Sequence, residues 1–436
     1  MIRKSLFAIL ALSFVSACSS SGIPSGTPGG AGETKKAPVE LTVYYQYAAD
    51  WNESDFNKVF AEPIKKKYPH ITLKYLVGGK GQNIPELITA GQKIDILFTS
   101  IGQTSSQLLD NGLQYDITPL IKKNNYDLSK LDATMVDAAK KLAKNNGIYG
   151  LPVFVPPTSI YYNKDLFDKF GVPYPKDGMT WDELYELSKK LTRTDAGVQY
   201  WGLGSSHGHL VLMNQLSLPI VDSATNKTTF NTDDKWKTWI DNLMRFYRIQ
   251  NGPLPDKLSE PHERNRFFKD RTVAMFLSVT ALHSQTEIGD MNWDLASFPV
   301  FSGNKVGPQA YPTYFYVTSM SDLKDDAFDV ISYLTSEEFQ TARAKEGTLL
   351  PTLSNHKVRE QFGQDNPMYK GKNVKALQPD QYAAPGSVNP YNKMAADDLG
   401  SGMKDMLLKG KDMNTMLRDV TEGSNKKIEQ AESAKK

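Results

Sequence analysis

Residues 146–192 decide the fold of this chain; they read NGIYGLPVFVPPTSIYYNKDLFDKFGVPYPKDGMTWDELYELSKKLT. Gly147–Gly150 predicts a short hairpin, and the apolar strand that follows it is interrupted by three prolines. Two of these, Pro156 and Pro157, stand just before a second predicted strand, Ser159–Asn163. Proline restricts its own φ and the conformation of the residue before it. The sequence therefore predicts a stiff connection between the two strands.

The second half of this stretch predicts two helices. A short helix ends at Phe170, and a turn bounded by prolines follows it. Thr180 and Glu183 have the spacing of a capping box, in which each side chain bonds the backbone N–H of the other residue. An apolar-periodic run comes next, so a helix is predicted to begin at Thr180.

The N-terminal residues predict targeting rather than folded structure. Arg3 and Lys4 precede an apolar run that is too short to span a bilayer, so residues 1–17 are predicted to be a signal peptide. Val15-Ser-Ala-Cys18 resembles the lipobox of bacterial lipoproteins, which implies that Cys18 carries lipid. Two acyl chains suffice for stable anchoring. Residues 18–38 are then a lipidated cysteine and a flexible linker, and the expected location is extracytoplasmic, at the cell membrane.

Composition excludes several classes of protein. Cys18 is the one cysteine of the chain, so disulfides and cysteine-based zinc sites are excluded from the folded part. The net charge is +2, and loss of the signal peptide would leave 49 basic against 49 acidic residues. Such a balance does not predict a nucleic-acid-binding protein. The remaining length of about 400 residues predicts two or three domains.

From Leu41 onward, strand-like and helix-like segments alternate, which predicts an α/β architecture with parallel strands. The first three strands are expected at Leu41–Tyr47, Ile71–Val77 and Ile94–Phe98. Ligands of open α/β sheets bind beyond the carboxyl ends of the strands. The side chains just after the first and third strands are therefore candidates for a binding site.

Two later segments predict helices of different kinds. Asp233–Ile249 is strongly amphipathic, and the helical spacing of Trp236 and Trp239 places both indoles in the core. The C-terminal region from Asn389 is mostly helical and is expected to break near Gly410. No internal repeat is present.

Several segments resemble, in the same order, the extracellular solute-binding proteins of bacterial ABC importers, and among them the carbohydrate type. Beside the opening stretch, these are Arg271–Phe276 (RTVAMF), Asp294–Pro299, Asp325–Gln340 (DDAFDVISYLTSEEFQ) and Gly347–Thr352 (GTLLPT). The resemblance implies a type II periplasmic-binding-protein fold, like that of maltose-binding protein, in which two α/β lobes are joined by hinge crossings.

The resemblance also implies a function and a division of the chain. It implies a monomeric receptor, not an enzyme and without a cofactor, that captures a sugar or oligosaccharide between its lobes and delivers it to the permease of an ABC importer. The lobes would rotate about the hinge and close on the ligand. The expected division is 39–153 with 299–349 for lobe 1, 159–294 with 353–433 for lobe 2, and 154–158, 295–298 and 350–352 for the hinge.

A sugar site needs aromatic faces for C–H patches and planar polar groups for hydroxyls. Residues of both kinds follow the predicted strands, although those after the first strand could instead pack in the core or cap a helix, and those after the third could cap a helix. Many relatives have Gly followed by Trp after the strand that ends at Phe276, where this chain reads LSVTALH, so a stacking aromatic is not expected there. The candidates are Tyr47, Asp50, Trp51, Ser100 and Gln103 in the first lobe, and His207, His209, Thr280, His283 and, by resemblance, Tyr391 in the second.

Other functions have weaker support in the sequence. His207-Gly-His209 is poorly spaced for a metal site, and no metal is expected. Gly204-Ser-Ser206-His-Gly208 matches the G-x-S-x-G elbow of hydrolases, but no HGGG-type loop precedes it. A purely structural lipoprotein would have no reason for repeated crossings between lobes. A receptor for a peptide, a metal chelate, a phosphorylated compound or an amphiphile remains open.

Overall fold

The computed structural model describes residues 36–143, 147–249 and 259–434. Pro38–Lys436 forms one compact unit. The predicted signal peptide, Cys18 and most of the predicted linker lie outside the described residues. No helix of the described residues is long and apolar enough to cross a bilayer.

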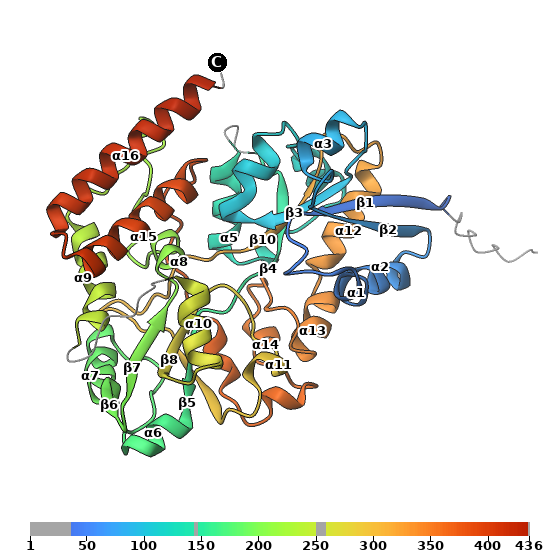
Figure 1. Ribbon diagram of the computed structural model, residues 1–436. Coiled ribbons are helices and arrows are strands. Elements are labelled where there is room, and N and C mark those ends of the chain that lie inside the picture. The colour runs from blue at the N-terminus through green and yellow to red at the C-terminus, as the bar shows by residue number, and fades with distance from the viewer. Residues whose placement is uncertain (1–35, 144–146, 250–258, 435–436) are drawn as a thin grey trace, which may run out of the picture. The chain divides into compact units, whose positions relative to one another are not determined.

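The first of two sheets is mixed rather than purely parallel. Its strand order is β2-β1-β3-β10-β4, with β1 parallel to both β2 and β3. β10, which comes much later in the chain, lies antiparallel between β3 and β4. Figure 1 shows β1 and β2 side by side. The strands are β1 (Val39–Tyr45), β2 (Ile71–Val77), β3 (Ile96–Ser100), β4 (Gly150–Phe154) and β10 (Thr313–Val317).

The second sheet has the order β6-β7-β8-β5-β9. Only β7 and β8 are parallel; the other neighbours are antiparallel. The tight turn between β6 and β7 uses Ala196 and Gly197, both with positive φ (47° and 79°), as a two-residue hairpin requires. The strands are β5 (Ser159–Asn163), β6 (Arg193–Asp195), β7 (Val198–Ser205), β8 (Val273–Ser278) and β9 (Trp293–Ser297).

Helices cover the faces of both sheets. On the first sheet, α12 packs against β10 and β4, and α5 packs against β4. On the second, α7 packs against β7, and α10 packs against β7 and β8. The helices that accompany the first sheet are α1 (Glu53–Phe56), α2 (Glu62–Lys67), α3 (Ile84–Thr89), α4 (Thr118–Lys123), α5 (Ala133–Leu142), α12 (Lys324–Leu334) and α13 (Glu337–Lys345).

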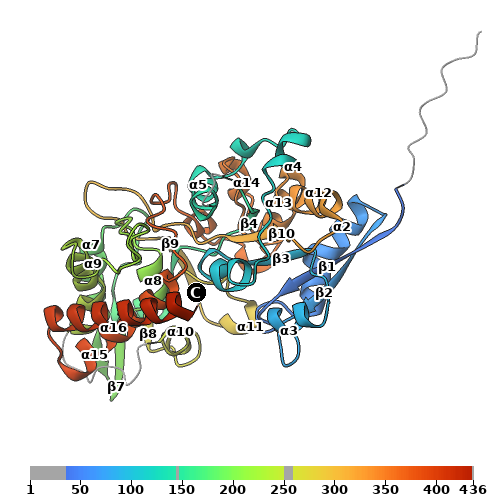
Figure 2. The same ribbon diagram turned by 90° about the horizontal axis from the view of Figure 1, so that it is seen from above.

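The two long helices at the C-terminal end of the described chain, α15 and α16, pack against each other and lie side by side in both views (Figures 1 and 2). Gly410, with φ 68°, ends α15 in the left-handed conformation that favours glycine. The helices that accompany the second sheet are α6 (Lys164–Phe170), α7 (Trp181–Leu191), α8 (His207–Leu212), α9 (Lys235–Met244), α10 (Glu260–Phe268), α11 (Gln285–Ile288), α15 (Asn392–Lys409) and α16 (Met413–Ala434). The short helix α14 (His356–Arg359) packs against α13.

Short 3₁₀ or π turns interrupt or replace regular α-helix at several positions. The segment after β1 is α1, a π turn and α2 in succession, and the segment after β3 is a 3₁₀ turn followed by a π turn. The turns are Asn57–Ala61, Ile101–Gln103, Ser105–Leu109, Leu128–Lys130, Arg245–Arg248, Pro367–Tyr369 and Val374–Leu377.

Several sequence predictions are confirmed. Thr180 and Glu183 form the capping box at the start of α7, with Thr180 Oγ1 accepting from the N–H of Glu183 at 3.2 Å. Trp236 and Trp239 are fully buried. The helix break at Gly410 is present. The architecture is α/β with two sheets, as expected.

Two predictions about local structure are wrong. Gly147–Gly150 is not a hairpin turn: β4 begins at Gly150, and its partner among the described strands is β10. A Cβ at Gly150 would lie 2.5 Å from the Phe315 carbonyl oxygen, so this glycine is needed for close strand packing instead. The expectation of parallel strands also fails where β10 enters the first sheet, because a strand arriving from the other sheet runs in the opposite direction.

The first and third connections between the sheets are bonded to each other. The chain leaves β4 at Phe154 and enters β5 at Ser159, and Val155 forms a bridge with Leu350. Thr352 Oγ1 donates to the Pro152 carbonyl at 2.8 Å. These contacts align two chain segments at the place where the prolines stiffen the first one.

The other connections differ from the predicted hinge. Residues 295–297 belong to β9, so the chain returns to the first sheet through 298–312. After Thr352 the chain first stays beside the first-sheet helices, where Gly363 N–H donates to the Ala344 carbonyl at 2.8 Å. It reaches the second sheet at Lys372, whose Nζ donates to the Trp293 carbonyl at 2.7 Å.

Candidate functional site

A cavity of about 760 Å³ is lined by residues that follow strands of both sheets. This volume is within the range of small-molecule sites. Its wall includes two of the connections themselves, residues 154–157 and 348–350. The remaining lining residues are Tyr45, Tyr47, Ala49, Asp50, Trp51, Asp55, Thr99, Ser100, Gln103, His209, Glu260, Arg264, Thr280, Ala281, Leu282, Ser284, Glu287, Tyr311, Thr313 and Lys393.

Aromatic side chains come mainly from the end of β1. The Tyr45 ring stacks on buried Phe98 with centroids 4.4 Å apart, and it meets Tyr47 edge-on at 5.9 Å. Trp51 packs against Phe154 with centroids 5.8 Å apart. Because the core holds these rings from behind, they form a rigid apolar surface on the first-sheet side of the cavity.

A carboxylate lies among these rings. Asp50 Oδ2 accepts a hydrogen bond from Tyr45 Oη at 2.9 Å. Burial and the nearby charge of Asp50 raise the pKa of the Tyr45 phenol well above its usual range, so this phenol keeps its proton and remains a donor. The first-sheet side therefore offers an aromatic face and an acceptor together.

Tyr311, on the connection that returns to the first sheet, closes another part of the wall. Burial raises the pKa of Tyr311 to about 12. The phenol lies over Gly102 so closely that a Cβ there would be 2.0 Å from Tyr311 Oη. Glycine at position 102 thus permits the contact between the turn after β3 and this aromatic ring.

The second-sheet side of the cavity is charged. Arg264, on α10, donates from Nη2 to Glu287 Oε2 at 2.8 Å and from Nε to Glu287 Oε1. His283 contacts the same carboxylate: His283 Nδ1 lies 3.0 Å from Glu287 Oε2, and His283 Nε2 lies 2.9 Å from Ser278 Oγ. Burial acts to raise the pKa of Glu287, but the hydrogen bonds from His283 and Arg264 outweigh burial and lower it to about 2.

Glu260 lies one helical turn before Arg264. Glu260 Oε1 is buried, has no hydrogen-bond partner in the described structure, and is 3.9 Å from Arg264 Nη1. Burial raises the pKa of Glu260, although Arg264 and the hydroxyl of Thr280 oppose this effect. One guanidinium thus lies between two carboxylates and gives both of its close hydrogen bonds to Glu287.

His209 lies where α8 meets the cavity. Its Nδ1 is 2.7 Å from Ser206 Oγ, and its ring stands edge-on to Tyr311 with centroids 6.0 Å apart. Burial, with a smaller effect from Lys393, lowers the pKa of His209 to about 4. The imidazole is therefore neutral at pH 7 and can either donate or accept a hydrogen bond.

The predicted site residues separate into two groups. Those that line the cavity are Tyr47, Asp50, Trp51, Ser100, Gln103, His209 and Thr280. Three others do not line it. His207 is buried against Tyr247, where burial lowers its pKa to about 4. His283 supports Glu287 from below, and Tyr391 is buried in the core of the second sheet.

Sequence reasoning missed the charged residues Glu260, Arg264 and Glu287, and the aromatic residues Tyr45 and Tyr311. The three charged residues lie on helices before and after β8 rather than directly after a strand, so the strand-end rule does not select them. One signal was available: Glu260 and Arg264 have the i, i+4 spacing of an ion pair on one helix face.

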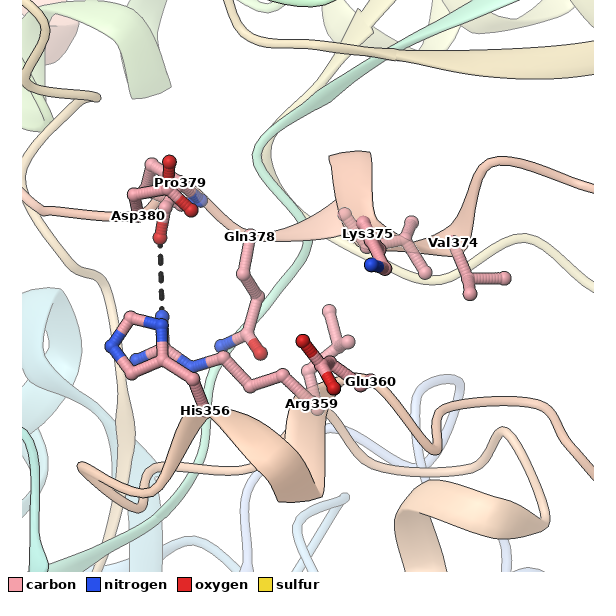
Figure 3. A pocket seen from close by; sticks show the side chains of 10 residues that line it. His356, Arg359, Glu360, Val374, Lys375, Gln378, Pro379 and Asp380 are labelled. Atoms are coloured by element: carbon pink, nitrogen blue, oxygen red, sulfur yellow. Dashed lines mark hydrogen bonds between the residues drawn. The ribbon is translucent and has the colours of Figure 1, made fainter.

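A second, much smaller cavity of about 80 Å³ lies between α14 and residues 374–380 (Figure 3). Arg359 Nη1 donates to the Pro379 carbonyl at 3.1 Å, and Gln378 Nε2 donates to the Pro351 carbonyl at 3.0 Å. Arg359 Nε and Gln378 Oε1 are buried and have no hydrogen-bond partner in the part of the chain that the structure describes. A donor and an acceptor in so small a space suit bridging water rather than a sugar ring.

The hydrolase motif has the expected context but not the expected geometry. β7 ends at Ser205 and α8 begins at His207, so Ser206 stands between a strand and a helix. Its backbone (φ −91°, ψ 92°) is extended, without the strain of a nucleophile elbow, and its side chain is 2% exposed. A histidine whose pKa is about 4 is also a weak general base at neutral pH.

Comparison with known proteins identifies the family and the fold. Residues 48–341 match the family model described as bacterial extracellular solute-binding protein. The arabinooligosaccharide-binding protein of Bacillus subtilis is 27% identical over 157 residues, which cover 34% of this chain. The matched segment spans 32% of that relative, about a third of its length.

Two solved structures have the same fold. An ABC substrate-binding protein from Listeria monocytogenes in complex with cycloalternan has a TM-score of 0.70 at 21% identity, covering 90% of this chain and 99% of that one. The sugar-binding protein MalE from Xanthomonas citri has a TM-score of 0.69 at 14% identity, covering 91% and 99%. The expected type II, maltose-binding-protein-like fold is thereby confirmed.

Proposed function

Because the chain belongs to the family of bacterial extracellular solute-binding proteins, we propose that it is the lipid-anchored receptor of an ABC importer for a sugar or oligosaccharide. One observation carries the proposal: a cavity lined from both sheets has aromatic rings on the first-sheet side and carboxylates on both sides. Rings suit the C–H faces of a sugar, and carboxylates suit its hydroxyls. The family is extracellular, and this supports an extracytoplasmic location for the protein.

The two sheets would act as the cores of two lobes. In this proposal lobe 1 contains β1 to β4 and β10, and lobe 2 contains β5 to β9 with α15 and α16. The bonded segments near Val155 and Leu350 would be the centre of the hinge. A ligand that contacts both lobes would favour the closed arrangement, and the permease would then recognise the closed form.

Anchoring by Cys18 is a separate part of the proposal. Its support is the lipobox-like Val15–Cys18 and the Gly, Ser and Pro content of the residues after it. Metabolic labelling with palmitate should mark the wild type and not Cys18→Ala. A Cys18→Ala protein that stays in the membrane fraction would contradict lipid anchoring, without bearing on the solute.

Calorimetry on the soluble form that lacks residues 1–37 tests the receptor function. The panel consists of arabinooligosaccharides, maltooligosaccharides, galactotriose and simple monosaccharides. We expect binding of at least one member, together with a rise in Tm, because a ligand that binds only the folded state stabilises it. If no member binds or shifts Tm, the carbohydrate assignment fails; the same assay with peptides then tests another solute class.

The absence of a covalent step is also testable. Since the function proposed is binding and delivery, the protein should leave each bound saccharide intact and should not hydrolyse nitrophenyl esters. Ester hydrolysis that Ser206→Ala abolishes would favour a hydrolase instead.

A further inference from the structure

The charged groups of the cavity are unbalanced. Its lining contains four carboxylates against two cations: Asp50, Asp55, Glu260 and Glu287 against Arg264 and Lys393. A count alone decides little, because exposed charges are screened. What matters is whether the cations are available to a ligand.

Both cations are already paired. Arg264 is held by Glu287 through two hydrogen bonds, of which Nη2 to Oε2 is 2.8 Å. Lys393 Nζ lies 2.5 Å from Oδ2 of Asp397, one turn further along α15. A carboxylate thus already compensates the charge of each cation, so an anionic ligand gains less from Arg264 and Lys393 than it would from unpaired cations.

The carboxylates, in contrast, retain acceptor capacity. Glu260 Oε1 is buried without a hydrogen-bond partner in the described structure, and its side chain is only 18% exposed. This oxygen is shielded from water and lies 3.9 Å from Arg264 Nη1, so a negative charge on a ligand beside Glu260 would meet a carboxylate whose charge water screens poorly. Opposite, Asp50 accepts from Tyr45 and is close enough to raise the pKa of Arg264.

We propose that this cavity selects saccharides without a negative charge and disfavours their carboxylated counterparts, and that Glu260 is the main residue for this selection. Glu260 would accept a hydrogen bond from a ligand hydroxyl or amino group through the part of its side chain that faces the cavity. The inference rests on the proposed function, since it names the ligand class of the same site. Like charges brought together in a poorly hydrated cavity oppose binding.

Pairs of matched ligands that differ in charge test the proposed selection against carboxylated saccharides. Arabinotriose, maltotriose and galactotriose are each converted at C1 to the neutral alditol and to the anionic aldonate, which share the opened ring and differ in charge. By calorimetry at low salt, we expect wild type to bind the aldonate at least about 10-fold more weakly than the alditol, a difference of about 1.4 kcal/mol.

Glu260→Gln should keep the shape of the side chain and remove its charge. We expect it to weaken alditol binding and to reduce the alditol-to-aldonate ratio at least about threefold. Glu429→Gln, on the exposed face of α16, is the matched control and should leave both affinities unchanged. The Tm of each variant shows that it is folded.

The outcomes separate the two proposals. If a saccharide binds but its aldonate binds as tightly as its alditol, the charge selection is overturned and the receptor function stands. If the alditol-to-aldonate affinity ratio is unchanged in folded Glu260→Gln, Glu260 is not the main residue for charge selection. If none of the neutral saccharides binds, the proposed function itself fails, and the inference fails with it.

Discussion

Arg264 and Glu287 form a two-point ion pair at the wall of the cavity, with Arg264 Nη2 2.8 Å from Glu287 Oε2 and Nε bonded to Oε1. The two residues lie on either side of β8 in the sequence, on α10 and α11. The pair fixes the orientation of the guanidinium, because a bidentate contact allows little rotation. The pair is also expected to make the free energy of unfolding depend on pH.

The pair should stabilise the protein at neutral pH and lose its effect in acid. The pKa of Glu287 is lowered to about 2, below the ordinary value of 4.5 that an unfolded chain would have. Its contribution is therefore fully present above pH 4.5 and is lost as the pH falls from 4.5 to 2. Urea unfolding of wild type and Glu287→Gln should show a larger difference in free energy of unfolding at pH 6 than at pH 3. A difference that does not change with pH would contradict this assignment.

Gly102 should be intolerant of even one methyl group. An added Cβ would lie 2.0 Å from Tyr311 Oη and 2.8 Å from Tyr311 Cζ, so the ring would have to move. We expect Gly102→Ala to lower the free energy of unfolding by about 1–3 kcal/mol, the usual cost of overpacking, and to weaken saccharide binding. Gly79→Ala is the control, since nothing lies within 4 Å of its Cβ position. Equal effects of the two substitutions would show that Tyr311 is free to move.

Trp51 should report ligand binding by fluorescence. The chain has six tryptophans, and Trp51 is the one among the residues that line the cavity. A bound sugar would change the environment of this indole, whereas the five others are buried elsewhere. We expect the ligand-induced change of emission to disappear in Trp51→Phe while calorimetry still detects binding. A change that persists in Trp51→Phe would place the ligand elsewhere or indicate a wider rearrangement.

Gln340 should be important for stability because it joins three buried backbone groups. Its Nε2 donates to the carbonyls of Val153 and Leu334, both at 2.7 Å, and its Oε1 accepts from Thr352 N–H at 3.0 Å. Gln340→Leu would leave all three without a partner, at a cost of about 3 kcal/mol or more in the free energy of unfolding.

The matched control for Gln340 is Gln361→Leu: among the described residues, the Gln361 side chain makes one hydrogen bond, from Nε2 to the nearby Lys357 carbonyl. Urea denaturation at neutral pH should show a change below about 0.5 kcal/mol for this control. If Gln340→Leu is equally mild, the two connecting segments do not depend on the Gln340 bridge.

The predictions from sequence succeeded where a local rule was sufficient. The capping box of Thr180 and Glu183 needs only a spacing of three residues, and the burial of Trp236 and Trp239 needs only helical periodicity. They failed where distant segments meet. Gly147–Gly150 resembled a turn, but β10, more than 150 residues later, pairs with the strand that begins there.

The sequence by itself determined the fold class, the family resemblance and much of the first-sheet side of the cavity, because residues just after parallel strands gather at one sheet edge wherever the strands lie. Only the tertiary structure decided the charged side of the cavity. Packing of α10 and α11 about β8 brings Glu260, Arg264 and Glu287 together, and the close hydrogen bonds of Arg264 go to Glu287, which leaves one oxygen of Glu260 without a hydrogen-bond donor among the described residues. Which charges remain available to a ligand depends on distances between side chains, and those distances exist only in the folded chain.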